Sequence, residues 1–67
     1  NEDYMRYAIT DWASNYLQYN GKFNFSAYGA NKGVPMEFKT FDDGWEYLYS
    51  KYPNDEDLED FQVIELN

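Results

Sequence analysis

The sequence predicts a small α+β fold, a single domain spanning residues 1–67 with the element order α-β-β-α-β. Two observations favour this fold: apolar residues recur at helical spacing in two segments, and apolar and polar residues alternate in two short segments between them. A chain of 67 residues is enough for one domain only. We therefore expect a three-stranded, mainly antiparallel sheet with two helices on one face.

The first segment, residues 4–19, is expected to form an amphipathic helix. Asp3 is a suitable N-cap, and Asn20-Gly21 supplies the stop signal because both residue types accept the left-handed conformation. At helical spacing, the apolar residues fall within one arc of about 100°, and they are Met5, Ala8, Ile9, Trp12, Tyr16 and Tyr19.

Two alternating segments follow and are expected to pair as a hairpin. Residues 22–28 and residues 34–40 each alternate apolar and polar side chains. Residues 29–33 between them are rich in Gly and Asn, which accept positive φ in tight connections. Pro35 has no N–H group to donate, so we expect an unpaired edge near the start of the second strand.

The second helix is expected to open at residues 40–43, with Thr40 or Asp42 as N-cap, and to end before Pro53. Gly44 is expected to weaken it by about 1 kcal/mol relative to alanine. Residues 54–60 are interpreted as an acidic loop or frayed turn, and residues 61–66 as a terminal strand. The expected buried stripe of the helix consists of Phe41, Trp45, Leu48, Tyr49 and Tyr52.

The composition argues against an enzyme and against a bound cofactor or metal. The chain has no Cys and no His, which removes disulfides, thiolates and imidazole ligands together. A carboxylate enzyme would need a pocket that so short a chain can hardly enclose. The acidic run from Asp55 to Asp60 lacks the glycine and the twelfth-position glutamate of a calcium-binding EF-hand loop. Stability is instead expected from aromatic packing.

The chain is expected to be located in the cytoplasm. The absence of Cys fits a reducing compartment. No apolar run approaches the roughly 20 residues that span a bilayer, so a membrane is not an expected partner.

The net charge of −8 is concentrated in one part of the sequence. Residues 1–41 carry four acidic and four basic residues, whereas residues 42–67 carry nine acidic residues and one basic residue, Lys51. Spread over a domain about 28 Å wide, nine carboxylates give about one charge per 3 Å. Duplex DNA carries about one charge per 1.7 Å, so the acidic third reaches roughly half of that density.

This asymmetry predicts a non-catalytic inhibitor or modulator that presents a nucleic-acid-mimicking face to a basic DNA- or RNA-binding protein. In size and charge the chain is similar to the small acidic anti-restriction and anti-CRISPR proteins of phages and plasmids, several of which act as DNA mimics. Direct nucleic-acid binding is not expected with five cations against thirteen anions. The expected partner-binding residues are Asp42, Asp43, Glu46, Tyr47, Asp55, Glu56, Asp57, Glu59 and Asp60.

An alternative is a small interaction module or weak homodimer that uses a Tyr-rich surface or a free strand edge. Tyr4, Tyr7, Tyr28 and Tyr47 do not fit the predicted apolar stripes, and Tyr47 falls on the outward side of the second helix. In this alternative the acidic third serves solubility and the helix N-terminus, where negative charge is favourable.

Overall fold

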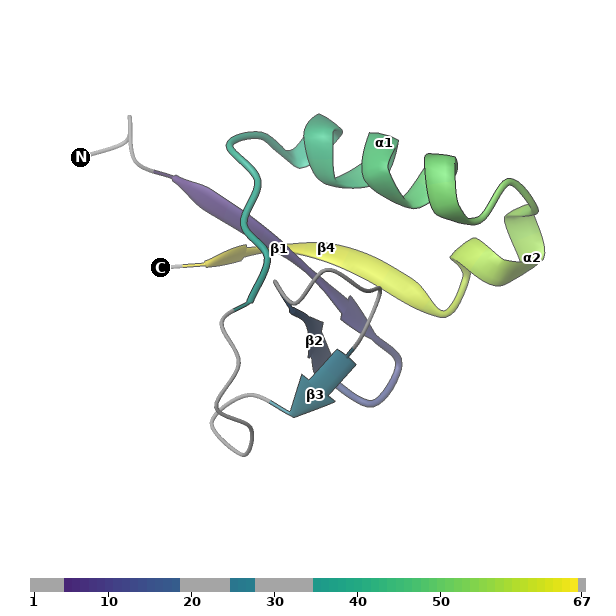
Figure 1. Cartoon of the computed structure of the whole chain (residues 1–67), viewed down its shortest axis with the longest axis horizontal. Coiled ribbons are helices and arrows are strands. Elements are labelled where there is room, and N and C mark those ends of the chain that lie inside the picture. The colour runs from purple at the N-terminus through teal and green to yellow at the C-terminus, as the bar shows by residue number, and fades with distance from the viewer. Residues whose placement is uncertain (1–4, 19–24, 28–34, 67) are drawn as a thin grey trace.

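The computed structural model describes residues 5–18, 25–27 and 35–66. Its strands form one antiparallel sheet in the order β3-β2-β1-β4. The predicted α+β class and the antiparallel sheet are confirmed, but the element order differs and the described residues form four strands instead of three. The elements are β1 (Arg6–Asp11), β2 (Asn15–Leu17), β3 (Phe25–Ala27), α1 (Phe41–Lys51), α2 (Asp55–Leu58) and β4 (Phe61–Leu66) (Figure 1).

The predicted helix over residues 4–19 is wrong, because its described part forms β1, a tight turn and β2. The Asp11 carboxylate accepts hydrogen bonds from the backbone N–H groups of Ala13 and Asn15, both at 2.9 Å. Ser14 within this turn has a φ of 65°. Asp11 thus stabilises a turn that competes with a helix, and the Tyr, Ile and Thr residues before it suit a strand.

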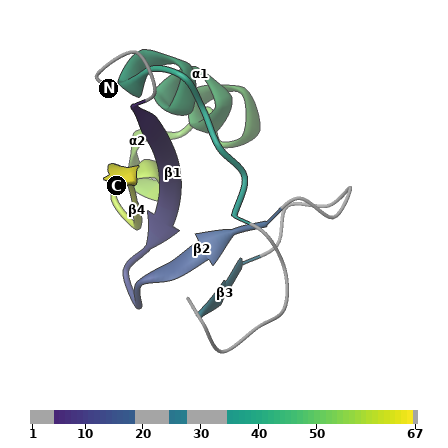
Figure 2. The same ribbon diagram turned by 90° about the vertical axis from the view of Figure 1, so that its left-hand side faces the viewer.

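The longest ladder joins the two ends of the chain. β1 pairs with β4 in the register Arg6↔Leu66 to Asp11↔Phe61, so the predicted terminal strand is confirmed. Ile9 lies opposite Val63, and both side chains are buried. Figure 2 shows the sheet bending between β1 and β2, which brings β2 round toward the same core.

The predicted strand over residues 34–40 is also wrong for its described part, which makes two isolated bridges, Gln18↔Pro35 and Tyr7↔Phe38. The N–H of Met36 donates to Leu17 at 2.8 Å, so this connection fastens β2 to the start of β1. Residues 25–27 of the other predicted strand pair with β2 instead. The predicted hairpin loop, residues 29–33, lies outside the described residues.

The start of α1 agrees with the prediction, but the face that it buries does not. The Thr40 hydroxyl caps the helix by accepting from the N–H of Asp43 at 3.0 Å. Gly44 and Leu48 are buried, whereas Tyr49, expected inside, is 57% exposed. A Cβ on residue 44 would lie 2.9 Å from a Val63 methyl carbon. The glycine therefore allows α1 to approach β4 closely, and this approach sets the rotation of the helix.

Gly44→Ala is expected to destabilise the domain by about 1–2 kcal/mol, the usual range for overpacking. Helix propensity alone predicts the opposite, a gain of about 1 kcal/mol. The buried, β-branched Val63 has little freedom to move away from the added methyl group. Urea denaturation of the variant, with Glu46→Ala on the exposed side of α1 as control, measures the sign. A more stable Gly44→Ala variant would contradict the close contact.

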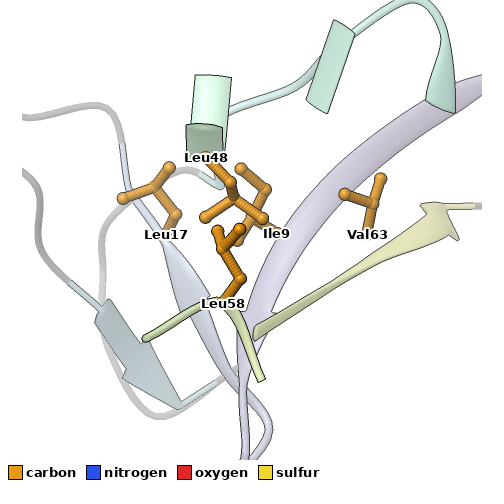
Figure 3. Packing of buried hydrophobic residues seen from close by; sticks show 5 residues of the cluster. All are labelled: Ile9, Leu17, Leu48, Leu58 and Val63. Carbon is orange, nitrogen blue, oxygen red and sulfur yellow. The ribbon is translucent and has the colours of Figure 1, made fainter. Parts of the chain in front are cut away.

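The core is built from aliphatic side chains of β1, β2, α1, α2 and β4. They are Ile9, Leu17, Leu48, Leu58 and Val63, which meet in Figure 3. Because Leu48 of α1 and Leu58 of α2 both contact this cluster, the two helices lie on the same face of the β1–β4 pair. Most of the aromatic residues packed against the cluster are half-buried. The radius of gyration is 11.6 Å, close to the value expected for one compact domain.

Candidate functional site

Acidic side chains at the beginning of α1 form the first part of the candidate site. Asp42, Asp43 and Glu46, here called the helix-start cluster, are all exposed. Asp42 and Asp43 occupy the first turn, where the helix dipole favours negative charge. The helix thus orients these carboxylates outward while Gly44 and Leu48 hold its other side on the sheet.

The second part is the acidic segment, defined as Asp55, Glu56, Asp57, Glu59 and Asp60, which are also all exposed. They lie on α2 and on the turn that follows it. Leu58 in the middle of this segment is buried in the core, and the N–H of Asp60 donates to Asp57 at 3.3 Å. Immediately afterwards, Phe61 stacks on Tyr52 with ring centroids 4.9 Å apart. The acidic segment is therefore fastened to the domain at Leu58 and at Phe61, directly after its last residue.

The helix-start cluster lies in the first half of α1, and the acidic segment begins four residues after the end of α1, also on the helical side of the molecule (Figure 1). Across residues 5–18, 25–27 and 35–66, the one ion pair joins Arg6 to Glu37 at 2.8 Å, outside both groups. Lys51, the basic residue between them, lies over the Tyr47 ring at 5.6 Å from its centroid.

Tyr47, expected to be an outward-facing aromatic anchor, is half-buried and packs against the core. Its ring centroid lies 5.5 Å from that of Phe38. The expected outward orientation of Tyr47 was wrong, because it assumed a different rotation of α1, which buries Gly44 and Leu48. Tyr7 likewise packs against the core. Tyr4 and Tyr28, also expected at the surface, lie outside the described residues.

Exposed aromatic residues were instead found where the sequence pattern placed core residues. Trp12, assigned to the buried arc of the first predicted helix, is 81% exposed in the turn closed by Asp11. Trp12 directly follows Asp11, and Asp11 pairs with Phe61, the residue directly after the acidic segment. The residues around Trp12 are Asp, Ala, Ser and Asn, and a turn prediction from these types would have identified it.

The phenol of Tyr52 responds electrostatically to this site. Burial raises its pKa above the ordinary value, and the charge of Asp57 and the neighbouring Tyr47 raise it further. The negative charge of Asp57, in the acidic segment, therefore affects the pKa of the residue that caps the C-terminus of α1.

We expect stability to decrease as the pH rises above about 10, partly through Tyr52. Because its folded-state pKa is raised, the native state holds the proton longer than the unfolded state, and stability is lost as the pH rises through the folded pKa. Denaturation at about pH 9 and pH 11 should show a smaller loss for Tyr52→Phe than for the unmodified chain. Equal losses for both proteins would contradict the assignment.

The described residues contain no group of three or more potential ligand residues that could hold a metal ion. Among them, no helix has the length and apolar character needed to cross a membrane. Comparison of the chain with protein-family models, curated proteins and solved structures gives no match.

Proposed function

We propose that this chain is a non-catalytic inhibitor or modulator that docks its acidic helical side onto a basic surface of a DNA- or RNA-binding protein. One observation carries the proposal. All eight carboxylates of the helix-start cluster and the acidic segment are exposed, and within the described residues the ion pair lies elsewhere. The acidic third therefore presents uncompensated negative charge on a folded scaffold.

Physical reasons favour a cationic partner for this surface. Like charges held together destabilise a compact state by mutual repulsion, and a basic partner relieves that repulsion. The same field accelerates association with a basic protein and disfavours acidic ones. A partner that ordinarily holds phosphates has the complementary pattern of Lys and Arg. In this proposal the carboxylates act as phosphate surrogates, as in anti-restriction or anti-CRISPR proteins of phages and plasmids acting in the host cytosol.

Trp12 is the aromatic residue best placed to contribute beside the acidic segment. Its indole is exposed on a turn that three hydrogen bonds to the Asp11 carboxylate hold in place. Tryptophan is enriched among the residues that dominate binding energy at interfaces, and a fixed turn lowers the entropy lost on binding. We therefore assign to Trp12 the anchoring role that the sequence pattern had given to Tyr47.

Affinity capture tests the proposal directly. The immobilised chain is exposed to a bacterial lysate, and bound proteins are eluted with a salt gradient and identified. We expect a basic nucleic-acid-binding protein that elutes as salt increases and that added duplex DNA or structured RNA also releases. Captured proteins that lack nucleic-acid-binding activity, or that stay bound regardless of salt, would refute the mimicry.

The alternative, an interaction module or weak homodimer, is favoured by the exposed apolar rings of Phe41, Tyr49 and Trp12. Sedimentation equilibrium distinguishes it from the leading proposal. The leading proposal predicts a monomer at all concentrations, because copies of so acidic a chain repel each other. A dimer that dissociates on dilution and is weakened by Tyr49→Ala would favour the alternative.

A further inference from the structure

An aromatic row runs along the exposed side of α1. Phe41, Trp45 and Tyr49 stand four residues apart, and successive ring centroids are 6.3 and 5.9 Å apart. Together with the carboxylates of Asp42 and Glu46, these side chains line an open hollow of about 420 Å³, here called the aromatic groove. Its volume falls within the range of about 300–1,000 Å³ that is typical of ligand sites.

The core accounts for only part of this row, in which Phe41 also meets Tyr7 edge-on, with ring centroids 6.3 Å apart. The helix contacts the sheet through Gly44 and Leu48, while Phe41 is 49% exposed and Tyr49 is 57% exposed. Of the three rings, only Trp45 packs against the buried cluster. Exposed aromatic rings that are grouped in a hollow, and not scattered singly, mark surfaces that contact a partner.

The charges that border the groove select the occupant. An apolar ligand would cover the carboxylates of Asp42 and Glu46 without pairing them, which is costly. A phosphate or an acidic peptide would be repelled. A guanidinium group suits both parts of the groove, because it stacks on aromatic faces and donates paired hydrogen bonds to a carboxylate. A lysine ammonium offers no plane for stacking and is more strongly hydrated.

We infer that the aromatic groove of α1 binds an arginine side chain of a basic partner segment, with the guanidinium stacked on Trp45 or Tyr49 and paired with Asp42 or Glu46. This inference rests on the proposed function in taking the partner to be a basic protein. It adds a chemical preference that net charge alone does not give, since arginine and lysine carry the same charge. The groove would distinguish among basic partners that the acidic segment attracts equally.

Tryptophan fluorescence provides the test, since the chain has two tryptophans. Trp12→Phe leaves Trp45 as the sole reporter, and this protein is titrated with hexa-arginine and with hexalysine at matched salt. We expect hexa-arginine to change the Trp45 emission and to bind about two- to fivefold more tightly than hexalysine, the scale of one exposed cation–π contact. Equal affinities, or no measurable binding of either peptide, would overturn the inference.

Two variants and one control test whether the preference for arginine over lysine arises in the aromatic groove. Tyr49→Ala and Glu46→Gln, both at exposed positions, should reduce the ratio of the two affinities toward one while leaving the fold intact. Asp57→Asn, in the acidic segment, should weaken both peptides and preserve the ratio. An unchanged ratio in Tyr49→Ala and Glu46→Gln would contradict the inference. Equal, salt-sensitive binding of both peptides would refute the groove but not the acidic surface. If hexa-arginine were preferred but the capture experiment yielded no nucleic-acid-binding protein, the aromatic groove would be supported and the proposed function refuted.

Discussion

Replacing Leu48 by alanine is expected to lower the free energy of unfolding by about 2–5 kcal/mol, the range for deleting a buried leucine side chain. Leu48 is fully buried and meets strands and α2 in the core. A domain of this size seldom has more than about 3–5 kcal/mol of stability in total. The variant should therefore be largely unfolded at room temperature, as measured by circular dichroism and urea denaturation.

Tyr49→Ala is the matched control, because it removes a larger side chain from the next position of the same helix. With Tyr49 mostly exposed, its loss should change stability by no more than about 0.5 kcal/mol, as for ordinary surface positions. The sequence pattern assigned both residues to one buried stripe, so the two variants separate that prediction from the observed rotation of α1. Similar losses in both variants would show that the rotation is wrong.

The second large effect concerns binding. Replacing Asp55, Asp57 and Asp60 together by lysine is expected to lower the affinity for the captured partner by at least about 100-fold, or roughly 3 kcal/mol. These three carboxylates lie on the acidic segment, where lysines would face a basic surface and repel it. The remaining binding should also depend less on salt. Isothermal titration at several salt concentrations measures both changes.

A control with the same change in net charge separates position from total charge. Lysine at positions 2, 3 and 37, in place of Glu2, Asp3 and Glu37, also takes the net charge from −8 to −2. This variant should lose affinity only modestly, by less than about tenfold, because its charges lie outside the acidic third. Equal losses in the two triple variants would mean that overall charge, and not the acidic segment, governs binding.

The second half of the fold was predictable because its signals are local. Thr40 bonds to the N–H of the residue three positions on, Pro53 follows the helix, and β4 combines aromatic and β-branched residues between turns. Each of these signals acts within a few residues of its position, so reasoning from a single sequence recovers them. α2 was only partly foreseen, as part of an acidic loop or frayed turn over residues 54–60.

The first half was not predictable from periodicity. The apolar residues of positions 5–16 fit a helical arc, yet the Asp11 carboxylate bonds to the N–H groups of Ala13 and Asn15 and reverses the chain. What stabilises β1 is its ladder with β4, from the other end of the sequence. Such long-range pairing leaves no trace in a local pattern, and tertiary contacts override helical spacing.

The candidate site was likewise predictable only in part. Exposure of the eight carboxylates follows from residue type alone, because unpaired Asp and Glu are almost never buried. The positions of Tyr47 and Tyr49 do not follow from residue type. Tyr47 was expected at the surface and Tyr49 in the core, and the structure reverses them because Gly44 fits against Val63. A glycine inside an amphipathic helix is a signal for close packing, and treating Gly44 only as a weak point missed it.

Competition for the captured partner tests the central claim, that the acidic helical side takes the place of nucleic acid. The affinity of the partner for a labelled duplex DNA or RNA is measured at increasing concentrations of the chain. If the two ligands share one surface, the apparent dissociation constant for the nucleic acid rises in proportion to the chain concentration and never levels off. A dissociation constant that stays constant, or that reaches a plateau because both ligands bind together, would contradict the claim.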